Sequence, residues 1–142
     1  MLAGRLVVAG TAVMLLVAIG CAHGQDGTEL EASNRVFARS IRWSDLTGLA
    51  QQIVPERQAE FLRLAAGSED NLKVNDYELD DVRISGDKAV VRSKVSWYLQ
   101  PSITNKTESM TVMWEQKGGG WWIVAIVGGP LPLPPVAPAA AP

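Results

Sequence analysis

The sequence predicts an α+β domain in which N-terminal helices pack on a strongly curved antiparallel sheet of about four strands. Apolar residues recur at spacings of three to four before Asn71 and at spacings of two after it, so helices precede strands. One predicted strand also carries an extra residue that breaks its alternation, and such a bulge bends a sheet. The folded domain is expected at 28–127, between two ends of different composition.

Three helices are expected in the first half of this domain. The segment 28–31 (Thr-Glu-Leu-Glu) has the order of a capping box, and the helical spacing continues to about Ser40. Ser44 is expected to cap a short second helix, with Trp43 packed back onto the core. Pro55 suits the first position of a third helix that ends near Gly67. The residues expected to face the core are Leu30, Ser33, Phe37 and Ile41, then Leu46, Leu49, Ala50 and Ile53, then Phe61, Leu62 and Ala65.

Four strands are expected in the second half. The first breaks phase between Leu79 and Val82, which makes Asp80 or Asp81 the extra residue of a bulge. Turns are expected at 85–87 and 118–120, and 121–127 is an almost wholly apolar last strand. The residues expected on the dry face are Tyr77, Leu79, Val82 and Ile84, then Ala89, Val91, Val95, Trp97 and Leu99, then Met110, Val112 and Trp114.

The domain resembles the cone-shaped fold shared by nuclear transport factor two, ketosteroid isomerase, scytalone dehydratase and the SnoaL-like cyclases. The residues that carry the likeness are Phe37 and the segments 43–46 (WSDL), 82–91 (VRISGDKAVV) and 120–124 (GWWIV). The likeness covers nearly all of 28–127. It implies a fold and does not specify an active site.

Residues 1–20 are predicted to be a signal peptide. Arg5 precedes fifteen apolar residues, 6–20, which as a helix rise about 22 Å, short of a hydrocarbon core of about 30 Å. The run ends in Gly20 before Cys21, which resembles the bacterial lipobox. The resemblance implies that Cys21 carries fatty acyl chains such as palmitate, which hold the protein at the lipid bilayer through a tether at 21–27.

The lipobox resemblance also implies an address in the bacterial cell envelope. Ala22 after the Cys favours the outer membrane, with the domain facing the periplasm. An ordinary secretory signal with an incidental Cys and an uncleaved membrane anchor are the alternatives.

The last segment, 128–142, carries six of the eight prolines and no charge. Prolines at this density forbid helix and ladder pairing, so an extended or disordered tail is expected. It is either a solvated end or a scaffold segment that recruits partners by docking in an aromatic groove.

Composition excludes several classes of site. Thirteen Lys and Arg against fifteen Asp and Glu leave no basic surplus, so no nucleic-acid partner is expected. A single Cys and a single His exclude an internal disulfide and a multi-Cys or multi-His metal site. The acidic pairs 69–70 and 80–81 lack the spaced oxygens of a calcium loop. We therefore expect no metal and no cofactor.

The fold resemblance implies that an enzyme of this kind would use a carboxylate or His as proton acceptor inside the cone. The predicted domain has no His, because His23 lies in the tether. The candidates are Glu108, in phase with the dry face of its strand, together with Asp45 and Tyr77. Each carboxylate has a structural alternative: Glu108 as a wet strand end, and Asp45 as a first-turn helix charge.

We therefore expect a non-catalytic module that binds an apolar small molecule or an envelope protein. A ketosteroid isomerase-like or cyclase-like enzyme with a pocket carboxylate is the alternative function.

The tryptophans suggest a second surface. Trp97 and Trp114 are expected in the core. Trp121 and Trp122 are consecutive and point to opposite faces of the sheet, so one of them lies outside. The outer one, with Val124, Ile126 and Tyr98, forms an apolar stripe through which the protein would form a homodimer. A monomer is the alternative.

Overall fold

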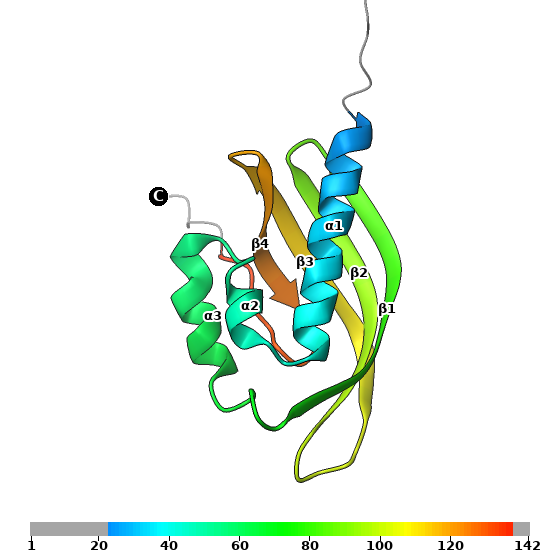
Figure 1. The fold of residues 1–142 in the computed structure, drawn as a ribbon, viewed down its shortest axis with the longest axis vertical. Helices are drawn as coiled ribbons and strands as arrows, with labels where there is room; N and C mark the ends of the chain where they lie inside the picture. Colours follow the sequence, from blue (N-terminus) through cyan, green and yellow to red (C-terminus); the bar gives the residue numbers. More distant parts are fainter. Residues whose placement is uncertain (1–22, 138–142) are drawn as a thin grey trace, which may run out of the picture.

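The computed structural model describes residues 23–137, and it has the predicted α+β architecture (Figure 1). Four antiparallel strands in the order β1-β2-β3-β4 form one sheet that curls around α1. The predicted signal peptide and Cys21 lie outside the described residues. The elements are α1 (His23–Arg42), α2 (Leu46–Ala50), the 3-10 helix η1 (Pro55–Arg57), α3 (Gln58–Ala65), β1 (Leu72–Ser85), β2 (Lys88–Leu99), β3 (Lys106–Lys117) and β4 (Gly120–Val127).

Helix α1 begins at His23, five residues before the predicted start. Thr28 therefore lies inside the helix and does not cap it. The tether predicted at 21–27 is helical from His23 onward, since adding turns to a packed helix costs little once its first turn exists. The residues that α1 buries against the sheet are Leu30, Asn34, Phe37 and Ile41, whereas Ser33 is only half-buried.

The joint between α1 and α2 differs from the prediction. Asp45, not Ser44, caps α2, and its carboxylate accepts a hydrogen bond from the backbone N–H of Gly48 at 2.9 Å. Ser44 has a positive φ of 54° and donates its hydroxyl to the carbonyl of Leu72 at 2.9 Å. Trp43 is 76% exposed, so its predicted packing onto the core is wrong. Ile41 and Leu46 on either side of this joint occupy the core instead.

The third helical segment begins at Pro55, but its first turn is the 3-10 helix η1 and α3 follows it. Phe61 and Ala65 are buried as predicted. Leu62 is 44% exposed, because it lies one residue away from that face of the helix.

Strand β1 contains two bulges, one predicted and one not. Asp80 is the extra residue between the pairs Leu79–Ser93 and Asp81–Arg92, which confirms the predicted phase break. Asn75 is a second extra residue, which the sequence pattern did not reveal. The two bulges keep the apolar residues of β1 on the face towards α1, and they add twist to the edge of the sheet. These residues are Leu72, Val74, Tyr77, Leu79, Val82 and Ile84.

Strand β4 also changes phase, at Val124. Trp114 pairs with Ile123 and Met113 pairs with Ala125, so Val124 is the extra residue. Ile126, beyond the shift, pairs with Val112 and is 1% exposed. The prediction that Ile126 lies in an outer apolar stripe is therefore wrong.

The interior of the cone is filled by aromatic side chains. Phe37 contacts both Tyr77 and Trp114 edge to face, each at a centroid distance of 6.3 Å. Trp97, Trp114 and Trp121 are buried, as predicted for the first two and for one of the Trp121–Trp122 pair. Leu99, expected on the dry face, is 43% exposed because it lies at the end of β2.

The Pro-rich segment folds back onto the sheet. Gly128 and Gly129 have φ values of 80° and 78° and reverse the chain after β4. Leu133 then exchanges two backbone hydrogen bonds with Ile126, at 2.8 and 2.9 Å. Leu131 and Leu133 are 2% and 0% exposed, so the prediction of a solvated tail is wrong for this part of 128–142. The last five residues lie outside the described range.

Candidate functional site

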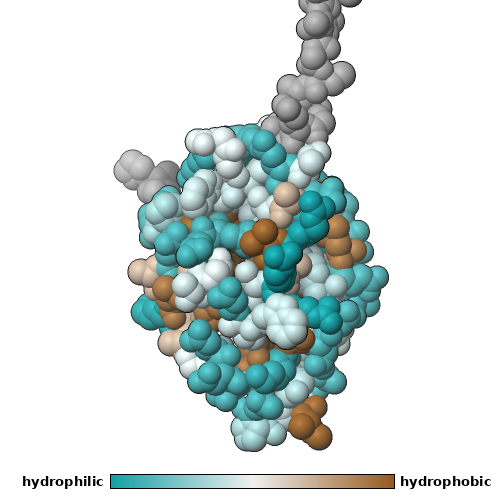
Figure 2. Space-filling view, viewed as in Figure 1, coloured by the Kyte–Doolittle hydropathy of each residue, from teal (hydrophilic) through white to brown (hydrophobic). Residues whose placement is uncertain are grey.

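The main candidate site is a groove between α1 and the second half of β1, which we call the α1–β1 groove. It has a volume of about 250 Å³ and a largely apolar lining. Figure 2 shows hydrophobic side chains at the surface over β1, beside α1. The residues that line the groove are Gly27, Leu30, Glu31 and Asn34 of α1, Leu79, Val82 and Ile84 of β1, and Val91 of β2.

The β1 wall of the groove is unusually exposed for a core-facing surface. Leu79, Val82 and Ile84 point to the same side of the sheet as the core, yet they are 49%, 43% and 42% exposed. Figure 1 shows that β1, at the edge of the sheet, curves away to one side of α1. Contiguous apolar side chains left open in this way mark binding surfaces.

The rim of the groove carries one charged lining residue. The Glu31 carboxylate accepts a hydrogen bond from the Arg35 guanidinium at 2.7 Å, one helical turn later on α1. Both side chains are exposed, so this ion pair adds little to stability. Because the Glu31 carboxylate is already paired with Arg35 of the same helix, the apolar wall is the main surface that the groove offers to a ligand.

The inner end of the groove is polar. Asn34 lines the groove and lies within 3.4 Å of the Tyr77 hydroxyl, which donates to its side-chain oxygen. Ser93 donates its hydroxyl to the same Tyr77 oxygen at 2.7 Å. Asn34 and Ser93 are 7% and 1% exposed. The three side chains satisfy one another at the boundary between the groove and the aromatic core.

Burial raises the pKa of the Tyr77 phenol, and the hydrogen bonds with Ser93 and then Asn34 act in the opposite direction. The phenol is therefore protonated at neutral pH. The phenol can donate one hydrogen bond, and it donates that bond to the side-chain oxygen of Asn34.

The structure does not bring the three predicted site residues together. Tyr77 lies at the inner end of the groove, and Asp45 caps α2. Glu108 is exposed, and its carboxylate accepts the backbone N–H of Gly129 at 2.5 Å. The Glu108 carboxylate thus secures the turn that leads into the Pro-rich segment.

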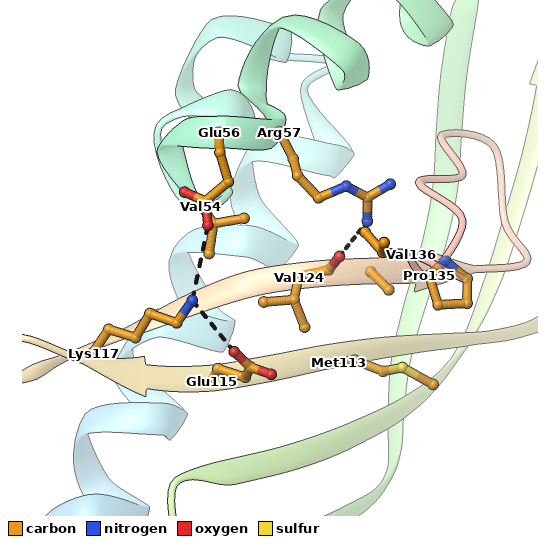
Figure 3. A pocket seen from close by; sticks show the side chains of 10 residues that line it. Val54, Glu56, Arg57, Met113, Glu115, Lys117, Val124, Pro135 and Val136 are labelled. Atoms are coloured by element: carbon orange, nitrogen blue, oxygen red, sulfur yellow. Dashed lines mark hydrogen bonds and ion pairs between the residues drawn. The ribbon is translucent and has the colours of Figure 1, made fainter. Parts of the chain in front are cut away.

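A second cavity, of about 390 Å³, lies on the outer side of the sheet between β3, β4, η1 and the Pro-rich segment (Figure 3). Arg57 reaches from η1 and donates to the carbonyls of Val124 and Pro134 at 2.5 and 2.6 Å. Its Nε and Nη2 atoms also donate to the two oxygens of the Glu60 carboxylate, each at 3.0 Å. Arg57 is 7% exposed, so this guanidinium is a structural clamp between strand and tail.

The other charges of this cavity are also paired. The Lys117 ammonium lies 3.5 Å from the Glu115 carboxylate and 3.9 Å from that of Glu56 (Figure 3). A ligand would have to displace these pairs, whereas the α1–β1 groove offers an open apolar wall. We therefore take the α1–β1 groove as the candidate site.

Sequence reasoning missed Asn34 and Ser93. Ser93 is in phase with Val91 and Val95 on the dry face of its strand, and Asn34 follows Leu30 by one helical turn. A polar residue in phase with an apolar face is the signal that would have found both.

Within residues 23–137, no group of His, Cys, Asp and Glu side chains is arranged to hold a metal ion. The same part of the chain has no helix long and apolar enough to cross a bilayer. Of the predicted outer stripe, Trp122 and Val124 are half-buried on the sheet and Tyr98 is half-buried on β2. A homodimer through this stripe stays a prediction.

Comparison with known proteins identifies the fold. No protein-family model and no curated protein matches the sequence. Solved structures match at low identity. A SEC-C motif containing protein from Rhodopseudomonas palustris is 12% identical with a TM-score of 0.58, over 70% of this chain and 78% of that one. A protein with a ketosteroid isomerase-like fold from Catenulispora acidiphila, in complex with trimethylamine, is 9% identical with a TM-score of 0.51, over 63% and 78%.

A putative dehydratase of the nuclear transport factor two-like family from Streptomyces avermitilis is 15% identical with a TM-score of 0.50, over 70% of this chain and 92% of that one. The fold is the nuclear transport factor two-like cone. At these identities the likeness establishes the fold alone, and the site must be argued from this chain's own residues.

Proposed function

We propose that this protein is a lipid-anchored lipoprotein of the bacterial cell envelope whose cone domain binds an apolar molecule in the α1–β1 groove. The observation that carries the proposal is the wall formed by Leu79, Val82 and Ile84, which face the core side of the sheet and are nearly half exposed. Their burial by a ligand contributes on the order of 1 kcal/mol for each side chain.

The polar end of the groove supports binding over catalysis. The side chains that meet there are an amide, a phenol and a serine hydroxyl, from Asn34, Tyr77 and Ser93. The predicted proton acceptors Glu108 and Asp45 accept backbone N–H groups elsewhere in the fold. The groove therefore offers shape and apolar surface, with hydrogen-bonding groups at its inner end.

The binding proposal is tested with the processed chain, residues 21–142, carrying Cys21→Ala to remove the acyl acceptor. A naphthylamine dye that fluoresces in apolar surroundings is titrated against it. Val82→Asp places a carboxylate in the wall and is expected to weaken dye binding by about tenfold or more, because an unpaired charge resists burial. Val90→Asp is the matched control, since Val90 is 38% exposed on the opposite face of the neighbouring strand. Equal dye affinity in the two variants would contradict the proposal.

The anchor is tested separately in bacterial cells fed an alkyne-tagged fatty acid. The lipobox ending at Cys21 predicts that the full chain incorporates the tag and that Cys21→Ala does not. An untagged wild-type chain, or tagging that persists in the variant, would refute lipidation at Cys21.

A further inference from the structure

The α1–β1 groove lies close to the predicted anchor along the chain. Helix α1 begins at His23, so one residue, Ala22, separates it from Cys21, and the two Cα–Cα steps span at most about 7 Å. Gly27, which lines the groove, follows His23 by one helical turn, or about 6 Å along the axis. Gly27 at the mouth of the groove is therefore at most roughly 13 Å from the Cα atom of Cys21, the predicted acylation site.

The opening of the groove is at the same end of the molecule as the first turn of α1. Figure 1 shows that the N-terminal end of α1 and the β1–β2 turn lie at one end of the cone, while the β2–β3 loop lies at the other. Ile84 is next to the β1–β2 turn, and a Cβ added at Gly27 would lie 4.0 Å from its Cδ1 atom. The apolar wall thus begins at the end of the domain to which the predicted anchor is joined through the N-terminus of α1.

From this placement, and resting on the proposed function, we infer that the groove takes the acyl chain of a bilayer phospholipid that enters from the membrane surface. An acyl chain that fills half of a hydrocarbon core is about 15 Å long, which is enough to cover the span of at most roughly 13 Å between the Cys21 Cα atom and Gly27. The groove volume of about 250 Å³ is below that of pockets for drug-sized ligands, and the end of an acyl chain is narrow enough to enter it.

The inference is tested with the full lipidated chain in vesicles of phosphatidylethanolamine and phosphatidylglycerol. The vesicles also hold a phospholipid with a diazirine at the end of one acyl chain. After irradiation, mass spectrometry of proteolytic peptides locates the cross-linked lipid. Adducts are expected on 27–34 of α1 and on 79–84 of β1, the two walls of the groove.

Two variants separate a filled groove from a misfolded domain. Gly27→Leu adds a side chain towards Ile84 and plugs the mouth, while removing a glycine from a helix interior, which favours the helix. It is expected to lower groove adducts on the order of tenfold, with an unchanged or higher midpoint of thermal unfolding. Ile103→Asp is the matched control, because Ile103 is an 86% exposed aliphatic residue in the β2–β3 loop at the far end of the cone.

Groove adducts that disappear in Gly27→Leu and persist in Ile103→Asp support the inference. Adducts that are absent from the groove, or equally strong in both variants, overturn it. If the naphthylamine dye still binds the Cys21→Ala chain in a manner sensitive to Val82→Asp, the proposed function stands without the phospholipid. If neither dye nor lipid reaches the groove, both proposals fall.

Discussion

The two edges of the sheet differ in whether another segment of the chain covers them. The β4 edge is closed by the chain itself, because Ile53 bridges Ile123 and Leu133 bridges Ile126. Strand β1 at the other edge is twisted by its two bulges, and the apolar side chains of its second half are left nearly half exposed. Aliphatic residues lie at both edges, so residue composition does not explain why one edge is covered and the other is open. What separates them is whether another segment of the chain covers the edge, and under the proposed function the open edge serves binding and the closed edge stability.

The largest expected effect compares one leucine from each edge. Leu133→Ala is expected to lower the free energy of unfolding by about 3 kcal/mol, because a fully buried side chain leaves a cavity. Leu79→Ala is expected to cost less than about 1 kcal/mol, because Leu79 is already 49% exposed. Urea unfolding of the processed chain, 21–142, measures both. Equal costs for the two leucines would mean that the edges do not differ in solution.

The alternation of side chains predicted the sheet well. Strand periodicity is a local property, so the phase break at Asp80 could be recognised from Leu79 and Val82 alone. The start of α1 was missed because the capping-box order at 28–31 occurs inside a helix that continues to His23. A capping signal in sequence does not exclude further turns before it.

The closed edge could not be predicted from local pattern. The prolines of 128–142 led to the prediction of no ladder pairing, and this is wrong at Leu133, which exchanges two backbone hydrogen bonds with Ile126. The burial of Leu131 and Leu133 depends on where the chain lies after the turn at Gly128, which is a tertiary property. The α1–β1 groove is unpredictable for the same reason, because it arises from the curl of β1 relative to α1.

The turn into the closed edge gives the second prediction. A Cβ at Gly128 would lie 2.5 Å from the carbonyl oxygen of Ser109, whereas a Cβ at Gly118 would meet nothing within 4 Å. Both glycines have positive φ, at 80° and 59°, so each alanine variant suffers backbone strain of about 1 kcal/mol. Gly128→Ala is expected to cost about 2 kcal/mol in all, because it also pushes the turn away from β3.

Urea unfolding of the two glycine variants separates strain from contact. If Gly128→Ala were no more costly than Gly118→Ala, the tail would tolerate displacement. Its burial would then contribute little to closing the β4 edge.

The smallest expected effect concerns the carboxylate that supports the Arg57 clamp. The hydrogen bonds from Arg57 lower the pKa of Glu60, with smaller contributions from the charges of Arg57 and Arg63, and burial opposes them. A carboxyl group whose pKa is lower in the folded state stabilises the fold above its unfolded pKa of about 4.3 and loses that contribution as the pH falls through the folded pKa. Glu60→Gln should therefore lower the urea midpoint at neutral pH, and this difference should disappear under acid conditions.

The Glu60 effect should be small because water screens the exposed carboxylate. The hydrogen bonds from Arg57 to the carbonyls of Val124 and Pro134 do not depend on the charge of Glu60. The β4 edge should therefore stay closed when Glu60 is neutral. Hydrogen exchange at the Leu133 amide reports on that edge directly, since this N–H bonds to Ile126. Protection that persists in acid would show that the clamp acts through its backbone acceptors. Protection lost together with the Glu60 charge would instead make the ion pair the part that keeps the tail on the sheet.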